Sequence, residues 1–141
     1  MLTDDAIQAR LFELWSSPPD SNADPLAAFG AVYTDPVLIN GAPMALTDLV
    51  GRARALHGAF SDHQIEIVDR VAQPGKLAIA FRHSARHTGP WTTPVGEIAP
   101  TGVTVTGVGI DLLTLQDDRV AEIWVLADEL QRLAQVGAVP G

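Results

Sequence analysis

One stretch of the sequence, GVGIDLLTLQ at residues 107–116, places a carboxyl group inside an apolar strand, where Asp111 stands between Ile110 and Leu112. Strand alternation puts Asp111 on one face with Gly107, Gly109, Leu113 and Leu115. A buried, unpaired carboxylate is costly, so folding raises its pKa or supplies partners, and carboxyl groups in cavities serve as acids or bases. We therefore predict that Asp111 is catalytic. A solvent-facing carboxyl, or one held by a structural hydrogen bond, is the alternative.

Two histidines share one face of the preceding segment, KLAIAFRHSARH at residues 76–87. His83 and His87 continue the face of Leu77, Ile79 and Phe81, which predicts that they point into a cavity as hydrogen-bond donors or as a proton relay to Asp111. We predict a catalytic role for His87 and a substrate-binding role for His83. A core or rim histidine would fit either position as well.

The histidine spacing does not favour a metal site. His83 and His87 lie about 13 Å apart on an extended strand, because each residue advances the chain by about 3.3 Å. We expect no metal. His57 and His63 fall near the end of a predicted helix and in the loop after it, and we expect both at the surface.

Several other side chains are predicted to contact a substrate. Asn40 could orient a water or a carbonyl group, although Asn-Gly is also typical of a turn. Trp91 lies in a loop that could act as a lid. The predicted substrate-binding aromatic residues are Trp15, Tyr33, Phe60 and Trp91, with core packing as the alternative for Trp15 and Phe60.

Helices come first along the chain. Thr3 is typical of a helix N-cap and precedes Asp4 and Asp5, and a helix is predicted up to residue 15. Asp24-Pro25 begins a short second helix, and Thr47 is predicted to cap a third, in which apolar residues recur at helical spacing up to Phe60.

Strands follow from about residue 64, where the apolar spacing changes to two. Residues 88–102 are predicted to be a loop, and the strands on either side of Asp117-Asp118 are predicted to form a hairpin. Asp128 caps a closing helix that ends at Gly137. Helices followed by a bent antiparallel sheet predict an α+β cone whose cavity binds a ligand.

Composition limits the class of protein. The 141 residues fit one domain, 1–141, and 47% of them are hydrophobic, which is typical of a globular protein. A formal net charge of −8 opposes binding to nucleic acid or to anionic membranes. With no cysteine there is no disulfide or thiolate chemistry. We see neither a signal peptide nor an apolar run of membrane-spanning length, and we expect a cytoplasmic protein.

The element order and four motifs resemble the SnoaL-like polyketide cyclases of the nuclear transport factor 2-like superfamily. The motifs are ARHTG (85–89), APTG (99–102), GIDLLTLQDDRVAEIW (109–124) and DELQRLAQVG (128–137). The resemblance implies an α+β cone made of a curved antiparallel sheet wrapped around N-terminal helices. It also implies a homodimer and a small apolar substrate, with ring closure by an intramolecular aldol step and no metal or cofactor.

The resemblance also assigns positions. The family's acid/base carboxylate corresponds to Val125, which we expect only to line the pocket; its histidine corresponds to Asp111 and its asparagine to Asn40. The related ketosteroid isomerases keep an aspartate protonated at the strand position of Asp111, a case known from general enzymology. They pair it with a tyrosine, and here Leu11 or Phe12 stands at the expected position of that tyrosine.

The sequence therefore predicts a cofactor-independent cyclase or isomerase of secondary metabolism, such as antibiotic biosynthesis, acting on an apolar polyketide-type molecule in an enclosed pocket. Asp111 is the acid or base. Because Val125 cannot abstract a proton, we expect substrate shaping to contribute strongly, in an aldol or pericyclic ring closure. Two alternatives are an epoxide hydrolase of the limonene type, which needs an Asp-Arg-Asp arrangement, and a non-catalytic module for small-molecule binding or dimerisation.

Overall fold

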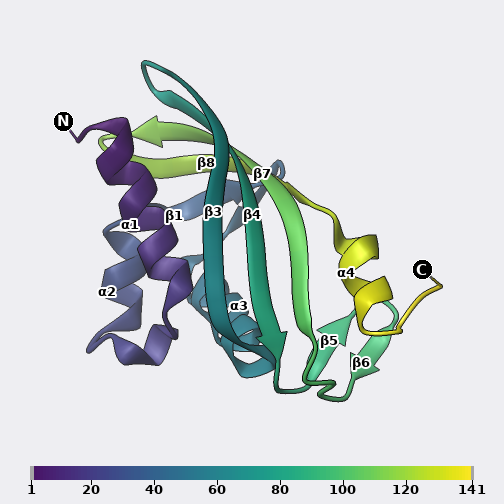
Figure 1. Cartoon of the computed structure of the whole chain (residues 1–141). Coiled ribbons are helices and arrows are strands. Elements are labelled where there is room, and N and C mark those ends of the chain that lie inside the picture. Colours follow the sequence, from purple (N-terminus) through teal and green to yellow (C-terminus); the bar gives the residue numbers. More distant parts are fainter. Residues whose placement is uncertain (1, 141) are drawn as a thin grey trace.

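The chain folds into helices packed against one curved sheet (Figure 1), as the computed structural model shows for residues 2–140. Three α-helices and a short strand pair, residues 33–44, precede the long strands. Within the described residues the helical elements are α1 (Asp4–Ser16), η1 (Pro19–Ser21, a 3-10 helix), α2 (Pro25–Gly30), α3 (Leu46–Ala59) and α4 (Glu129–Gln135). The predicted α+β class and its order of elements are confirmed.

Side chains fix where most helices begin. The Thr3 hydroxyl accepts a hydrogen bond from the backbone N–H of Ala6 at 3.1 Å, and the Asp24 carboxylate accepts one from Ala27 at 3.1 Å. Both caps satisfy N–H groups that the first helical turn leaves unpaired, as predicted. Helix α3 differs, because Ala45 is its N-cap and gives no side-chain bond. The prediction that Thr47 caps this helix is wrong.

Six strands form the main sheet in the order β2-β1-β8-β7-β4-β3, and two short strands form a separate hairpin. All neighbouring pairs are antiparallel except β1 with β8, which is parallel. The strands are β1 (Tyr33–Ile39), β2 (Ala42–Met44), β3 (Phe60–Gln73), β4 (Lys76–His87), β5 (Trp91–Thr93), β6 (Gly96–Ile98), β7 (Thr104–Gln116) and β8 (Arg119–Ala127).

Two boundaries differ from the sequence prediction. Strand β3 already begins at Phe60, directly after α3, because the ladder with β4 continues as far as the pairing of Phe60 with His87. The predicted loop 88–102 contains the hairpin β5-β6, closed by the pairing of Thr93 with Gly96. The early start of β3 arises because pairing with β4 overrides the local preference of the segment, whereas β5 and β6 pair only with each other, within the segment predicted as a loop.

Tight turns join neighbouring strands where the sequence placed polar or glycine pairs. Asn40 and Gly41 have φ angles of 50° and 86°, and Asp117 and Asp118 have φ angles of 51° and 62°. Positive φ at two successive residues is typical of the hairpin turn whose twist matches that of the strands. The predicted turn at Asp117-Asp118 is confirmed, and the turn interpretation of Asn40 holds.

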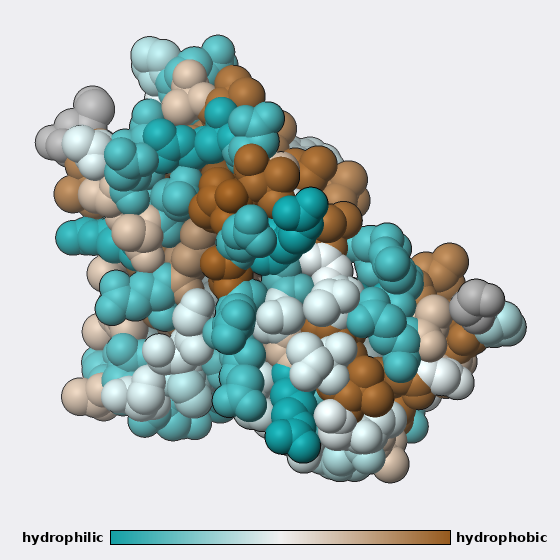
Figure 2. Space-filling view, in the orientation of Figure 1, coloured by the Kyte–Doolittle hydropathy of each residue, from teal (hydrophilic) through white to brown (hydrophobic). Residues whose placement is uncertain are grey.

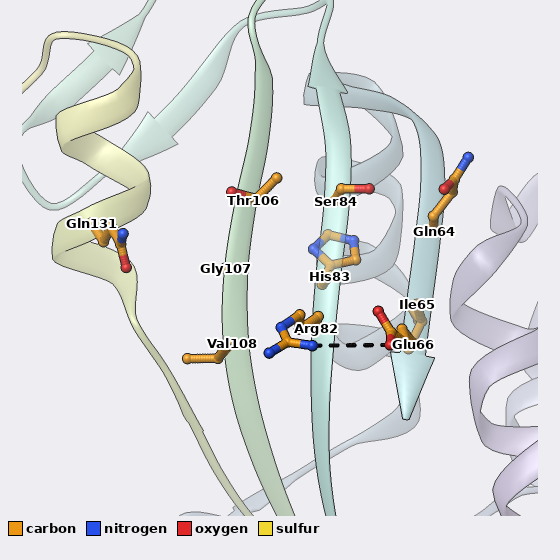
Figure 3. Close-up of a pocket in the computed structure, with 10 residues that line it drawn as sticks. All are labelled: Gln64, Ile65, Glu66, Arg82, His83, Ser84, Thr106, Gly107, Val108 and Gln131. Carbon is orange, nitrogen blue, oxygen red and sulfur yellow. Dashed lines mark ion pairs between the residues drawn. The ribbon is translucent and has the colours of Figure 1, made fainter. Parts of the chain in front are cut away.

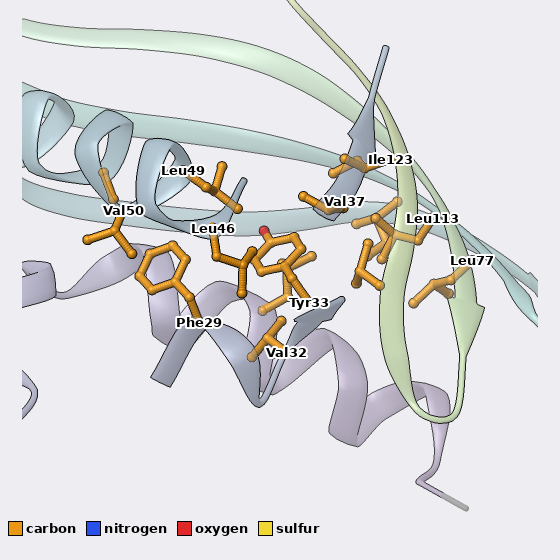
Figure 4. Packing of buried hydrophobic residues seen from close by; sticks show 14 residues of the cluster. Phe29, Val32, Tyr33, Val37, Leu46, Leu49, Val50, Leu77, Leu113 and Ile123 are labelled. Carbon is orange, nitrogen blue, oxygen red and sulfur yellow. The ribbon is translucent and has the colours of Figure 1, made fainter. Parts of the chain in front are cut away.

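The main core lies between the helices and the inner face of the sheet (Figure 4). Phe29 from α2, Leu49 from α3 and Leu113 from β7 belong to it, each nearly inaccessible to solvent. Phe29 also stacks on Tyr33 with ring centroids 6.2 Å apart. This core fixes the helices over one half of the sheet and so positions the pocket beside it.

The outer face of the sheet is apolar and exposed. Ile110 lies opposite Leu126 and Leu112 lies opposite Trp124 in the register of β7 and β8, and these four side chains are 40–75% exposed. In Figure 2, hydrophobic atoms gather in the upper middle of the face shown, over the strands. Within residues 2–140, no helix has both the length and the apolar character needed to cross a membrane.

Candidate active site

A pocket of about 290 Å³ lies between α1, α3 and the inner face of the sheet. Its wall is predominantly apolar, with a few polar groups among the aromatic and aliphatic side chains, which is the usual composition of a small-molecule site. The residues that line it are Leu11, Phe12, Trp15, Tyr33, Ile39, Leu49, Arg52, Leu56, Ile65, Phe81, His83, Asp111, Ile123, Val125, Ala127 and Arg132.

Asp111 lies in the wall of this pocket, in the middle of β7. Its neighbours across the ladder are Ile79 of β4 and Val125 of β8, so aliphatic side chains flank it on both sides. Only 6% of the residue is exposed, and its Oδ1 atom has no hydrogen-bond partner among the described residues. Burial raises the pKa of Asp111 to about 7. Both protonation states are therefore accessible at neutral pH.

Tyr33 is the second polar group of the pocket. Its hydroxyl oxygen accepts a hydrogen bond from the indole N–H of Trp15 at 2.7 Å, which leaves its proton available for a ligand. Burial, and to a lesser degree the nearby charge of Asp111, raises the pKa of Tyr33, so it stays a neutral donor. A tyrosine thus accompanies the aspartate, but it comes from the start of β1 and not from the helix position of Leu11 or Phe12.

His83 joins the pocket to a chain of histidines. His63 Nε2 lies 3.1 Å from the carbonyl oxygen of Phe60 and must donate to it, so a neutral His63 accepts at Nδ1 from His83 Nε2, 3.2 Å away. The ring of His57 lies 4.4 Å from that of His63, measured between centroids. Both side chains are half-buried. The prediction that His57 and His63 are surface groups is wrong.

The same surroundings keep His83 uncharged. Burial, followed by the positive charge of Arg132 and then by the two neighbouring histidines, lowers the pKa of His83 to about 4. Burial, followed by the charge of His57, also lowers the pKa of His63. His83 is therefore a neutral imidazole at pH 7, with Nδ1 as its remaining acceptor.

His87 lies elsewhere. Asp111 pairs with Ile79, and His87 is eight residues further along β4, about 26 Å away at the usual rise of a strand. His87 is fully buried in a second cluster, where its ring contacts Phe60 and Trp91. A relay from His87 to Asp111 is excluded by this register, and the predicted catalytic role of His87 is corrected.

Three other predicted substrate contacts also lie outside the pocket. Phe60 and Trp91 pack on each other in the cluster of His87, with ring centroids 5.0 Å apart. Asn40 is exposed, and its side chain accepts from the backbone N–H of Val125 at 2.8 Å and donates to its carbonyl oxygen at 3.2 Å. Asn40 therefore fastens the β1-β2 turn to β8. The pocket does bring together Asp111, His83, Tyr33, Trp15 and Val125.

Sequence reasoning missed two arginines in the pocket wall. Arg52 lies three residues after Leu49 and four before Leu56, on the helix face that turns toward the pocket, so helical periodicity could have found it. Arg132 gave no such signal, because its place depends on how α4 docks against β7. Arg52 is exposed as well as lining the pocket, whereas the half-buried Arg132 was hidden by the expectation that arginine faces solvent.

The pocket wall contains one carboxyl group, that of Asp111. A limonene-type epoxide hydrolase needs two around an arginine, so the lining does not favour that alternative. Among residues 2–140, no cluster of three or more histidine, cysteine, aspartate or glutamate side chains could hold a metal ion.

Helices that cover a curved sheet, and a carboxyl group shielded in the pocket between them, define an α+β cone of the ketosteroid isomerase or nuclear transport factor 2 type. A model of the SnoaL-like polyketide cyclases matches residues 7–136. The chain belongs to the SnoaL-like polyketide cyclase family. A comparison with curated proteins found no match.

Solved structures support the fold. AclR from Streptomyces galilaeus is 20% identical with a TM-score of 0.75, covering 99% of this chain and 85% of that chain. TsrD from Streptomyces laurentii is 16% identical with a TM-score of 0.77, covering 99% and 100% of the two chains. A protein of ketosteroid isomerase-like fold from Catenulispora acidiphila is 14% identical with a TM-score of 0.72, covering 97% and 96%.

Proposed function

We propose that this protein is a cofactor-independent cyclase or isomerase that acts on an apolar, polyketide-type small molecule in the pocket. The observation that carries the proposal is Asp111, a carboxyl group with an unpaired oxygen atom in an apolar wall and a pKa of about 7. A group of this pKa takes and returns protons efficiently at neutral pH. Family membership supports ring closure as the reaction type.

A single carboxyl group can complete an aldol ring closure. In its ionised form Asp111 removes a proton from the acidic carbon between two carbonyl groups of the substrate. The resulting enolate carbon attacks a second carbonyl carbon, and the alkoxide formed there takes the same proton back from Asp111. The hydroxyl of Tyr33 donates a hydrogen bond to the oxygen that carries the developing charge.

Val125 shapes this chemistry, although it is not a base. It lies directly opposite Asp111 on β8, at the position where the family carries its carboxylate. An aliphatic neighbour avoids repulsion between two carboxylates and keeps Asp111 desolvated. Holding a flexible chain so that its reacting carbons meet can contribute several kcal/mol, roughly 7–11 in the best intramolecular cases. The apolar wall supplies this effect for aldol and pericyclic closures alike.

Proton exchange tests the role of Asp111 without knowledge of the natural substrate. We expect the protein to accelerate deuterium incorporation at the α-carbon of 2-tetralone, an apolar cyclic ketone, as followed by proton NMR in D₂O. Asp111→Asn should lower this acceleration by at least about 100-fold, the usual contribution of a positioned acid or base. Asp48→Asn, which replaces an exposed carboxylate on α3, is the matched control and should leave the rate unchanged.

The outcome separates catalysis from binding alone. A container would bind 2-tetralone with equal affinity before and after Asp111→Asn and would show no exchange above buffer in either form. That result would remove the acid/base proposal and favour the small-molecule-binding module.

We also propose that the protein is a homodimer formed through the outer face of the sheet. Contiguous exposed apolar side chains on β7 and β8 support this, because a patch of that kind marks an interface and a two-fold contact buries the same patch on both copies. A second copy suits a protein of net charge −8, since these strand positions carry no charge and do not repel each other.

Sedimentation equilibrium tests the dimer. Leu126→Glu, which places a charge on the most exposed patch residue, should convert dimer to monomer. Leu130→Glu on α4, which alters a leucine that is 68% exposed, should leave the dimer intact. A monomeric unsubstituted protein would refute the proposal.

A further inference from the structure

Helix α4 is fastened to β7 where that strand extends beyond its partner β8. The ladder between them ends at the pairing of Gly109 with Ala127, and the backbone N–H of Asp128 then donates to the carbonyl oxygen of Val108 at 3.2 Å. The side-chain amide of Gln135 accepts from Thr106 N–H at 2.8 Å and donates to Thr106 O at 2.7 Å. Gln135 thereby replaces a neighbouring strand and fixes the position of α4.

From this helix Arg132 reaches the inner side of the sheet. Gly107 lies opposite His83 in the register of β4 and β7 (Figure 3). Strand alternation puts Gly107 on the face that also carries Asp111. A Cβ atom at Gly107 would stand only 2.6 Å from Arg132 Nε and 3.3 Å from its Cγ. The missing side chain of Gly107 therefore provides the space through which Arg132 passes to line the pocket.

The guanidinium of Arg132 has no carboxylate partner. Among residues 2–140 no ion pair and no side-chain hydrogen bond involves it. Neutral His83 is its titratable neighbour. Asp111 does not neutralise it either, since burial alone accounts for the raised pKa of that carboxyl. A half-buried cation without a partner is costly, which favours binding of a ligand that supplies the opposite charge.

The charge of the pocket wall is opposite to that of the whole chain. The protein carries a net charge of −8, whereas the pocket wall carries Arg52 and Arg132 together with one acid that is half protonated near pH 7. A ligand that enters therefore meets a positive wall inside an acidic protein. Arg132 offers a planar set of donors, which suits an oxyanion such as a carboxylate.

We propose that Arg132 binds an anionic oxygen group of the ligand, and that the pocket therefore selects apolar molecules that carry one carboxylate or comparable acidic oxygen. Gly107 acts as a positioning residue, because it allows the side chain of Arg132 to lie across β7. This inference rests on the proposed function in one respect, which is that the pocket is the substrate site.

Two matched dyes test the charge preference. The anionic probe is 8-anilinonaphthalene-1-sulfonate, and N-phenyl-1-naphthylamine is the same ring system without the sulfonate. Fluorescence titration of the full chain gives a Kd for each dye. We expect Arg132→Gln to weaken binding of the anionic dye about tenfold, the effect of losing one charge-assisted contact at a partly exposed site. The neutral dye should change less than twofold.

Further variants isolate the cause. Gly107→Ala keeps Arg132 but displaces its side chain. This variant should weaken binding of the anionic dye to a similar degree, while the neutral dye still binds. Arg132→Lys should restore part of the loss, because charge remains but the planar fork is lost. Arg10→Gln, which removes an exposed arginine on α1, is the control and should change neither Kd.

Several outcomes overturn the inference. If Arg132→Gln weakened binding of both dyes equally, the residue would be assigned to packing. If binding of both dyes were unchanged, Arg132 would not select anionic ligands. The test is independent of catalysis. Anion selectivity without ketone exchange would refute the proposed cyclase activity and support the anion-binding role of Arg132. Ketone exchange without anion selectivity would support the activity and refute the role of Arg132.

Discussion

Asp111 and His87 are the two buried polar or charged residues among residues 2–140, and each has one buried side-chain atom without a hydrogen-bond partner. They sit on the same face of the same sheet. Asp111 borders a pocket, whereas His87 is enclosed by Phe60 and Trp91 and is held at Nδ1 by Thr101, whose Oγ1 lies 2.9 Å away. Their burial is similar, but their surroundings are not.

The difference shows what turns a buried polar atom into a site. Asp111 borders a pocket that a ligand can occupy, so the cost of burying its carboxyl group can be recovered on binding. His87 is fully buried against the rings of Phe60 and Trp91 and does not line the pocket, so a ligand there does not reach it. Burial alone would therefore make both residues candidates for a functional site, and the adjoining pocket favours Asp111.

Exchanging the imidazole of His87 should have no catalytic effect. We expect His87→Gln to keep the rate of ketone proton exchange within about twofold, while Asp111→Asn loses at least about 100-fold, because an acid or base acts only within hydrogen-bond reach of its substrate. NMR exchange rates at saturating 2-tetralone decide the matter. A loss in His87→Gln comparable to that in Asp111→Asn, with an unchanged circular dichroism spectrum, would contradict the separation of the two regions.

Stability should respond to pH through Asp111. Its pKa is raised from 3.8 to about 7 in the folded state, so the folded protein binds more protons than the unfolded chain between these values and loses stability as pH rises through them. The loss is at most about 4 kcal/mol. Asp111→Asn lacks this titration and should gain stability relative to the unsubstituted protein between pH 4 and pH 8. Urea unfolding at both pH values measures the difference in unfolding free energy between Asp111→Asn and the unsubstituted protein. The same difference at both pH values would refute the role of Asp111 in this pH dependence.

The rate of exchange should follow the same ionisation. Removing a proton from carbon needs the carboxylate of Asp111, so the rate should rise about tenfold from pH 6 to pH 8 and then level off, as expected for a group of pKa about 7. The His87→Gln variant should show the same profile. A profile that is flat over this range would mean that another group takes the proton.

The smallest effect is expected at His83, on the pocket side of β4. Burial and the neighbouring Arg132 and histidines lower the pKa of His83 from 6.5 to about 4. Between these pH values the unfolded chain binds a proton at this histidine that the folded protein does not bind, so the folded protein loses stability as the pH falls. His83→Gln should therefore be less sensitive to acid than the unsubstituted protein. Urea midpoints at pH 7 and pH 5 report the change. Greater acid sensitivity in the variant would contradict the neutral state of His83.

Local patterns were sufficient for much of the architecture. The caps at Thr3 and Asp24, the turn at Asp117-Asp118 and the face shared by Asp111 with Gly107 and Gly109 were all predictable, because each depends on a few adjacent residues. The start of β3 was not, because its pairing with β4, further along the chain, decides it. The hairpin β5-β6 is a local pairing, and it was missed because the glycine and proline residues of 88–102 indicated a loop.

The candidate site was predictable only as far as local strand alternation reaches. Alternation along β4 correctly placed His83 and His87 on one face, but it could not show that the cavity covers only one of them. Tyr33 was expected among pocket residues, yet only the tertiary structure shows that it lines the same pocket as Asp111.

The sequence by itself determined which residues are apolar, where helices and turns begin, and that one carboxyl group sits within an apolar strand, because these properties depend on side-chain chemistry and short-range spacing. Only the tertiary structure decided that Asp111 borders a pocket, that His87 does not, and that Arg132 enters through the space left by Gly107. Each of these depends on the packing of segments distant in the chain, and strand register and helix docking set that packing.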